Sequence, residues 1–220
     1  ERKQLTCGTT WHAAGLVGQL RATRNLTELA KYTADLYHSL EAETGQATGF
    51  KQNGSVSVAK TLARLEELQR GASMGKTFGL RIDELSPGEI KERWPLLEVG
   101  DVVGGIFLPG DGQTNPIDTT QALARGARQR GAKILENTRV ERIRVEKGRA
   151  VGVETASGYI AADTVVLCAG MWSHRMAADI GVALPLHAAE HFYIVTEPID
   201  GLPGNLPVLR VQDECAYYKE

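Results

Sequence analysis

The stretch LTCGTTWHAAGL, residues 5–16, consists almost entirely of small or uncharged residues. Gly and Ala let a backbone approach a ligand closely, because they place little or no side chain in the way. Trp11 and His12 stand side by side at its centre. A single histidine is more often an ordinary packed or exposed side chain than a functional one. By itself, the stretch therefore predicts only a close approach between backbone and ligand.

The composition is that of an ordinary globular protein, with 220 residues, 42% of them hydrophobic and 24% charged. This length suffices for one large domain or two interleaved smaller ones. A net charge of -2 gives no electrostatic reason to expect nucleic acid or an anionic membrane as a partner. No apolar run reaches the roughly 20 residues of a membrane span. Residues 1–4 lead into no apolar segment typical of a signal peptide.

The cysteines Cys7, Cys168 and Cys215 are odd in number and far apart. This spacing argues against a disulfide framework and against a zinc site, and it fits a reducing compartment. No set of residues has the spacing of metal ligands, so we expect no metal.

Helical and strand-like patterns alternate along the chain. Asn25 and Glu28 have the spacing of a capping box, and the apolar residues that follow predict a helix ending at Gly45. Ser86, followed by Pro87 and Glu89, predicts a second capped start. In total, helices are expected over 25–45, from 62, over 87–94, over 116–130 and over 172–180.

Apolar and alternating segments predict the strands. Residues 53–59 alternate like a half-buried strand. Thr164–Cys168 is a run typical of a strand buried on both faces of a parallel sheet. The segments 189–196, 207–211 and 214–219 indicate an antiparallel sheet. The expected strands are 53–59, 102–108, 132–135, 139–145, 150–155, 164–168, 189–196, 207–211 and 214–219.

Seven short motifs follow one another along nearly the whole chain: Trp11–Leu16, Gly45-Gln46, Gly54-Ser55, Pro95–Leu97, Pro109–Pro116, Cys168–Ser173 and Glu190–Thr196. Each is weak singly, but their order and spacing are specific. Together they resemble the motifs of the dimethylglycine and sarcosine dehydrogenase family of FAD-dependent oxidoreductases, which are related to D-amino-acid oxidase. Asn115 departs from the family pattern, because many relatives carry Asp there. This change leaves a capping role intact and argues against a charge-based role.

The resemblance implies a mixed α/β (α+β) fold, in which a partial Rossmann-like FAD-binding domain is interleaved with an antiparallel-sheet substrate domain. We expect the FAD-binding domain over residues 1–45 and 109–181, and the substrate domain over residues 46–108 and 182–220.

The Gly-rich signature of a dinucleotide fold is not found in this sequence. That signature, Gly-x-Gly-x-x-Gly, is followed about 20 residues later by an acidic residue that binds ribose. Gly110-Asp111-Gly112 lacks the third glycine. We interpret Glu1 as the ribose-binding acid and the chain as a fragment that lacks the first βα unit. We expect this fragment to bind FAD poorly on its own. The alternative for Glu1 is an ordinary surface residue.

The resemblance implies that His12 is bonded covalently to the 8α-methyl carbon of FAD. Such a bond needs a neutral imidazole nitrogen as the nucleophile beside the dimethylbenzene edge of the flavin. If His12 faces elsewhere, the flavin is held without a covalent bond. The neighbouring residues expected to contact the cofactor are Thr9, Thr10, Trp11, Ala13 and Ala14.

Val140, Ala169, Gly170 and Trp172 complete the expected cofactor site. Ala169-Gly170 lies where a strand meets a helix, and a larger side chain would block the pyrophosphate or the flavin there, while a helix N-terminus offers free N–H groups. Val140 lies on a strand whose counterpart in related enzymes meets the adenine through its backbone. The alternative for Ala169-Gly170 is a tight turn without a ligand, and the alternative for Val140 is an ordinary core valine.

His191 and Tyr193 are the expected catalytic residues. On a strand they would point to the same face, where they could orient an amine or accept its proton. The alternative is that both pack between sheets. A substrate carboxylate would need a cation, and the sequence does not choose among Arg21, Arg24 and Arg210.

The resemblance implies oxidation of a small N-methylated amine or amino acid by hydride transfer to FAD, with an unknown electron acceptor. Tetrahydrofolate would bind in a further C-terminal domain. The expected location is the cytoplasm of a bacterium or the mitochondrial matrix of a eukaryote. One alternative is a non-catalytic relative, similar to the regulatory subunit of pyruvate dehydrogenase phosphatase. A weaker one is a flavin oxidase acting on another amine or on a glycerol phosphate.

Overall fold

The computed structural model describes all residues, 1–220, and divides them into two compact units. Unit 1 comprises Glu1–Cys7 and Lys133–Pro198, and unit 2 comprises Gly8–Ala132 and Ile199–Glu220. These bounds differ from those of the two predicted domains. The assignment of residue ranges to cofactor and substrate domains stays a prediction.

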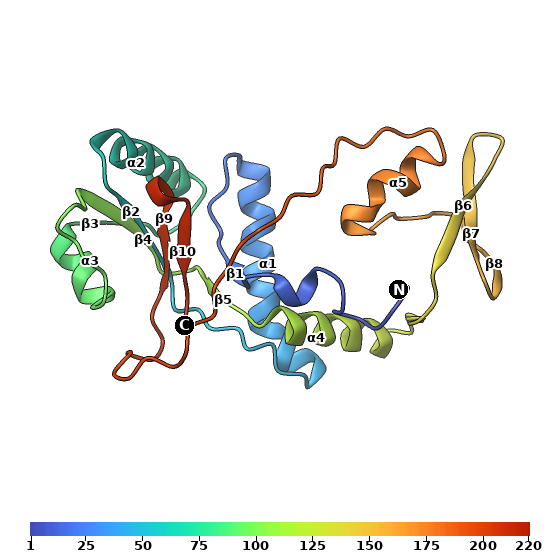
Figure 1. The fold of residues 1–220 in the computed structure, drawn as a ribbon, viewed down its shortest axis with the longest axis horizontal. Helices are drawn as coiled ribbons and strands as arrows, with labels where there is room; N and C mark the ends of the chain where they lie inside the picture. The colour runs from blue at the N-terminus through green and yellow to red at the C-terminus, as the bar shows by residue number, and fades with distance from the viewer. The chain divides into compact units, whose positions relative to one another are not determined.

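Unit 2 is built on a five-stranded mixed sheet (Figure 1). Its order is β10-β9-β2-β4-β3, in which β2 and β9 run parallel and the other neighbours run antiparallel. The strands are β2 (Ser55–Ala59), β3 (Asp83–Leu85), β4 (Gly104–Leu108), β9 (Val208–Val211) and β10 (Ala216–Tyr218).

The central strand β2 is buried at all five positions. Val56 and Val58 pack in a cluster with Ile90 of α3 (Pro87–Arg93). Ala59 belongs to a second cluster, with Leu68 and Ala72 of α2 (Leu62–Thr77). The prediction of a half-buried strand was therefore wrong, because side chains cover both faces of β2. Trp94 closes the first cluster, and its Nε1 donates to the Pro207 carbonyl at 2.7 Å.

Two capped helices pack together in unit 2 (Figure 1). Helix α1 (Arg24–Thr44) ends at Gly45, whose φ of 69° is left-handed, as predicted. Its N-cap is Thr23, whose hydroxyl accepts from Leu26 N, so the predicted capping box of Asn25 and Glu28 was wrong.

Helix α4 (Pro116–Gln129) begins at the predicted cap, Asn115. The Asn115 side chain accepts hydrogen bonds from the amides of Ile117 and Asp118, at 3.0 and 3.3 Å. Gly126 allows a close approach to α1, because a Cβ there would lie 3.1 Å from Thr44 Cγ2.

A short ladder joins β1 (Leu16–Val17) to β5 (Gly112–Gln113), and Lys51 forms an isolated bridge to Gln113. A 3-10 turn, η1 (Thr10–His12), precedes β1. A second turn, η3 (Gln212–Glu214), connects β9 to β10.

Unit 1 contains an antiparallel sheet of β6 (Val140–Glu146), β7 (Arg149–Thr155) and β8 (Gly158–Ala161). The 3-10 turn η2 (Gly170–Trp172) and helix α5 (Ser173–Ala178) follow. The mixed α/β architecture agrees with the predicted fold class.

Three predicted strands do not form in unit 1. Residues 132–135, 164–168 and 189–196 contain no strand. Val166 is 77% exposed and Phe192 is 91% exposed, so neither 164–168 nor 189–196 is a buried segment. A strand depends on backbone pairing with a neighbour, and no ladder joins these segments to another strand. The expected antiparallel sheet reduces to β9 and β10, with β9 paired to β2 on its other side.

Candidate functional site

The predicted cofactor residues fall into both units. Unit 2 holds the contiguous stretch from Thr9 to Ala14, and unit 1 holds the others. No helix in the structure combines the length and apolar character needed to cross a bilayer. No three His, Cys, Asp or Glu side chains come together as a metal ion would require.

Trp11 and His12 lie on η1, at the surface of unit 2. Their ring centroids are 3.5 Å apart and their planes are inclined by 33°. The turn is closed by Ala13 N, which donates to Thr10 O at 3.0 Å, and it packs against α4. Trp11 is 51% exposed. An aromatic ring and an imidazole thus lie at this surface.

Three backbone stretches converge next to η1, and glycines permit their close approach. Thr114 N donates to Gly15 O at 2.8 Å, and a Cβ on Gly15 would lie 2.1 Å from Thr114 O. Gly112 approaches the stretch around Lys51 in the same way, since a Cβ added at Gly112 would lie 2.1 Å from Lys51 O. Real Cβ atoms do not come so close to backbone, so both positions require glycine.

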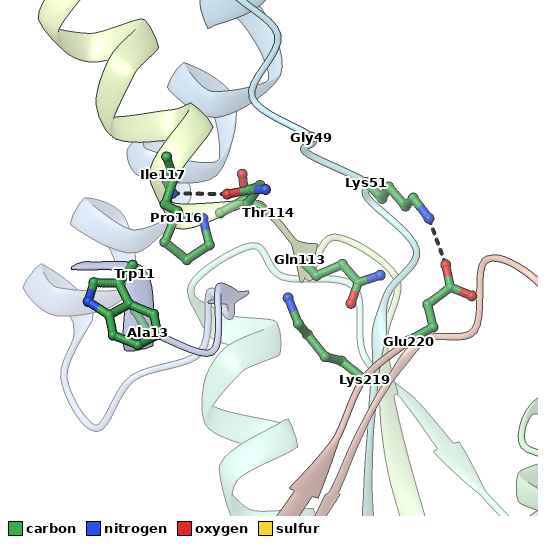
Figure 2. Close-up of a pocket in the computed structure, with 11 residues that line it drawn as sticks. Trp11, Ala13, Gly49, Lys51, Gln113, Thr114, Pro116, Ile117, Lys219 and Glu220 are labelled. Atoms are coloured by element: carbon green, nitrogen blue, oxygen red, sulfur yellow. Dashed lines mark hydrogen bonds and ion pairs between the residues drawn. The ribbon is translucent and has the colours of Figure 1, made fainter. Parts of the chain in front are cut away.

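A cavity of about 380 Å³ opens beside these stretches (Figure 2). One wall is apolar and is formed by Trp11 and Ala13 together with Pro116 and Ile117 at the start of α4. Two residues of the predicted ligand-contacting stretch, Trp11 and Ala13, therefore border a cavity within unit 2. The other residues of that stretch do not line it: Thr9, Thr10, His12 and Ala14.

The opposite wall is polar and comes from the β5 region and the C-terminal end of the chain (Figure 2). Lys51 Nζ and Glu220 Oε1 form an ion pair at 2.7 Å. The hydrogen bond from Lys51 holds the pKa of the Glu220 carboxyl below its ordinary value. Burial lowers the pKa of the Lys219 ammonium, and the charge of Lys51 lowers it further. Gln113 is 5% exposed, and its buried Oε1 has no hydrogen-bond partner.

A buried carboxylate, Asp111, lies at the other end of β5. Its oxygens accept from Gln19 N at 2.8 Å and from Ser55 Oγ at 2.6 Å. Burial raises the pKa of Asp111, although these hydrogen bonds and the charges of Arg210 and Arg21 act in the opposite direction.

Arg21 and Arg210 converge on this carboxylate. A Cβ on Gly18 would lie 3.2 Å from Arg210 Nη2, 3.5 Å from Arg21 Nη1 and 3.5 Å from Asp111 Oδ2. The charges of both arginines act on the buried Asp111 carboxyl without an ion pair to it, whereas Arg24 is exposed at the first turn of α1. None of the three lines the cavity.

Within unit 1, the structure brings Glu1 next to the segment that leads into β6. Glu1 O accepts from Thr138 N at 2.8 Å, and the Glu1 ammonium donates to Leu135 O at 2.9 Å. The guanidinium of the adjacent Arg2 lies 4.4 Å from the centre of a Trp172 ring. The residues just before Val140 therefore contact Glu1, and Trp172 contacts the adjacent Arg2.

Ala169 and Gly170 form a turn, as expected. Trp172 N donates to Ala169 O at 3.1 Å, and Gly170 has a φ of 55°. The buried strand that was expected before this turn does not form. The turn enters α5, a helix of six residues.

His191 and Tyr193 lie in an exposed segment without strand structure. The argument that a strand points both side chains to one face is therefore not supported by this structure. Their role stays a prediction.

Several residues of the cavity were not singled out by sequence reasoning, and Gln113 and Lys219 are among them. Gln113 belongs to the quoted 109–116 motif, so its place in the motif was visible. Lys219 follows a short strand, and nothing in its sequence neighbourhood indicated a cavity.

Several known proteins are similar to this chain in sequence. The chain is 42% identical to human mitochondrial sarcosine dehydrogenase over 225 residues, covering all of this chain and 24% of that protein. It is 40% identical to a formaldehyde-forming 4-methylaminobutanoate oxidase of Paenarthrobacter nicotinovorans, covering all of this chain and 27% of the relative. It is 36% identical to the mouse pyruvate dehydrogenase phosphatase regulatory subunit, again over the whole chain and 25% of the relative. The chain thus spans about a quarter of the length of these relatives.

Among solved structures, L-proline dehydrogenase from P. horikoshii superposes with a TM-score of 0.77 and 27% identity, over 83% of this chain and 48% of that one. A family model described as FAD dependent oxidoreductase (DAO) matches residues 1–219. This chain therefore belongs to the DAO family of FAD-dependent oxidoreductases.

Proposed function

We propose that the protein containing this chain oxidises a small N-methylated amine or amino acid by hydride transfer to FAD. The observation that carries the proposal is the unit 2 cavity, which has Trp11 and Ala13 on its apolar wall, next to His12, and a polar wall opposite. The names of the relatives, sarcosine dehydrogenase and 4-methylaminobutanoate oxidase, support an N-methylated substrate.

The residues around the cavity fit a flavin ring. An isoalloxazine is flat and apolar at its dimethylbenzene edge and carries polar atoms at its other edge, and the cavity offers one apolar and one polar wall. The unpartnered Gln113 Oε1 is a buried acceptor that a bound group could satisfy. When bound, FAD supplies the redox chemistry. The protein supplies position, orientation and the exclusion of water.

In this proposal, His12 holds the flavin covalently and Trp11 packs against it. Thr9, Thr10, Ala13 and Ala14 provide the small surroundings that let the ring approach the backbone.

The cofactor residues of unit 1 take the adenosine and pyrophosphate part of FAD. Glu1 binds the ribose, Val140 meets the adenine through its backbone, and Ala169, Gly170 and Trp172 form the turn beside the pyrophosphate. His191 and Tyr193 orient the amine and take up its proton.

Denaturation of the flavin-loaded protein tests the covalent bond. The yellow colour should stay with the polypeptide in the wild type and leave it in His12→Ala, while Trp11→Ala should keep the bond. Release of the flavin from the denatured wild type would refute covalent attachment.

Flavin bleaching tests the activity and separates it from the non-catalytic alternative. Under anaerobic conditions, an N-methylated amine should reduce and bleach the flavin. A regulatory relative would bind FAD and keep its colour with every amine. Bleaching by glycerol phosphate, and not by amines, would favour the other oxidase alternative.

A further inference from the structure

Asp111 is a buried carboxylate that the proposed chemistry does not use. It is 4% exposed and lies directly before β5, outside the cavity. Both of its oxygens accept a hydrogen bond, Oδ1 from Gln19 N at 2.8 Å and Oδ2 from Ser55 Oγ at 2.6 Å. One donor belongs to the loop after β1 and the other to β2, so the side chain joins two segments that are distant in sequence.

The backbone around Asp111 joins the same two segments. Asp111 O accepts from Gly54 N at 2.9 Å, one residue before β2. The next two residues form β5, which pairs with β1. Asp111 therefore ties the chain that follows the Thr9–Ala14 stretch to the five-stranded sheet of unit 2.

The loop after β1 packs closely against the residues around Asp111. A Cβ on Gly110 would lie 2.6 Å from Gln19 Oε1, so the loop side chain occupies the space that a larger residue would need. On the neighbouring Gly18, a Cβ would lie 3.5 Å from Asp111 Oδ2. This packing limits the positions that the loop can take.

A short path leads from this anchor to the turn η1. Thr114 N donates to Gly15 O at 2.8 Å, and β1 follows directly. Because β1 has only two residues, its pairing with β5 supplies few hydrogen bonds to hold its position. The grip of Asp111 on Gln19 N supplies a further one just beyond β1. The placement of Trp11 and His12 thus depends on an anchor outside the turn itself.

We propose that Asp111 is a positioning residue for the flavin. By holding Gln19 N and Ser55 Oγ, it fixes β1 and thereby places His12 for attachment of the cofactor. This inference rests on the proposed function, in which His12 holds the flavin. Asp111 does not line the cavity, so it acts through the segment that it anchors. Without the carboxylate, two buried donors lose their acceptor, and the loop must move to satisfy them.

Hydrogen exchange measures the positioning directly, in the complete protein prepared without FAD. Asp111→Leu keeps a similar shape but removes both acceptors. It should raise the exchange rates of peptides covering residues 10–17 by ~10- to 100-fold, and these peptides exclude the Gln19 amide itself. Asp111→Asn retains an oxygen for Gln19 N and an amide that can donate to Ser55 Oγ, so its exchange rates should stay within about threefold of the wild type.

Addition of FAD to the same preparations measures the consequence for the cofactor. The rate at which yellow colour becomes resistant to denaturation should fall by ~10- to 100-fold in Asp111→Leu, and Asp111→Asn should restore it. Ser55→Ala removes one of the two donors and leaves the bond to Gln19 N, so it should slow attachment by less than Asp111→Leu does.

Ile90→Val is the control for a general loss of stability. It shortens a buried side chain of α3 in the first hydrophobic cluster, which contains no residue of the 9–21 segment. The variant should unfold at a lower urea concentration and change neither the exchange over residues 10–17 nor the attachment rate.

The inference is overturned if Asp111→Leu leaves either measurement unchanged, if Asp111→Asn does not restore both, or if Ile90→Val has the same effect. Should Asp111→Leu fail to fold, Ser55→Ala decides, and unchanged attachment in that variant overturns the inference. Flavin released from the denatured wild type would count against the covalent bond of the proposed function. Exchange over residues 10–17 needs no flavin, so it still decides whether Asp111 anchors the stretch.

Discussion

Units 1 and 2 differ in how well their apolar segments are covered. In unit 2, β2 has a strand on each side and side chains packed on both faces, and both hydrophobic clusters of the structure lie there. In unit 1, the apolar segments 164–168 and 189–196 form no strand, and Ile194 is 90% exposed. The contrast teaches that an apolar run specifies a strand only where a partner strand is present to receive it.

Hydrogen exchange in the 220-residue chain should separate the two units most strongly. Amides of β2 should exchange at least about a thousandfold more slowly than amides of 164–168, because their exchange requires global unfolding. Mass spectrometry of exchanged peptides measures both. Equal protection of the two segments would erase the comparison.

One tryptophan in each unit allows the packing of the two units to be compared directly. Trp94→Ala in unit 2 should lower the free energy of unfolding by about 3–5 kcal/mol, since it removes a buried ring from the core. Trp172→Ala in unit 1 removes a half-exposed ring and its contact with Arg2, and should cost only about 0.5–1 kcal/mol. Urea denaturation measures both, and equal losses would contradict the difference in packing.

Asp111, in unit 2, makes the folding stability depend on pH. Its folded pKa is raised by burial, so between the ordinary value near 3.8 and the raised value the folded state binds more protons than the unfolded state. This group's contribution to stability is therefore present at low pH and is lost as the pH rises through that window.

Asp111→Asn isolates the contribution. Asn cannot ionise, so the difference in unfolding free energy between wild type and variant should change across the window and level off above it. The test is denaturant unfolding at a series of pH values. A pH-independent difference would show that the buried carboxyl does not titrate in this range.

A surface ion pair in unit 1 should contribute least to stability. Arg142 donates to Glu154 Oε2 at 2.7 and 3.2 Å across the β6–β7 ladder, but the Arg142 side chain is 65% exposed. A double-mutant cycle with Arg142→Ala and Glu154→Ala should give a coupling of about 0.2–1 kcal/mol, decreasing with added salt. A coupling above that range would mean that unit 1 is more tightly packed than its exposure indicates.

Local signals in the sequence predicted the helices best. Gly45, Ser86 and Asn115 determine helix ends through their own backbone conformation or side chain, so neighbouring residues sufficed. The strands 164–168 and 189–196 were wrongly predicted, because strand pairing depends on residues elsewhere.

The candidate site was predictable only in part. The apolar wall around Trp11 and Ala13 follows from a contiguous motif. The polar wall pairs Gln113 with Lys219, which are distant in the chain, and no periodicity connects them. Whether a polar group is left without a partner is decided by tertiary packing, so the sequence alone could not reveal the unpaired Gln113 Oε1.

The parallel pairing of β2 with β9 has a consequence for biosynthesis. One edge of β2 pairs with β4, but on the other edge residues 55–58 pair with residues 208–211, so a ribosome must first deliver all of the intervening segment. Until then, the nascent chain carries β2 with one bare edge and with Val56 and Val58 incompletely covered. Such an edge attracts other unfolded chains, and production of this protein will therefore depend on chaperone capacity during the delay between the two strands.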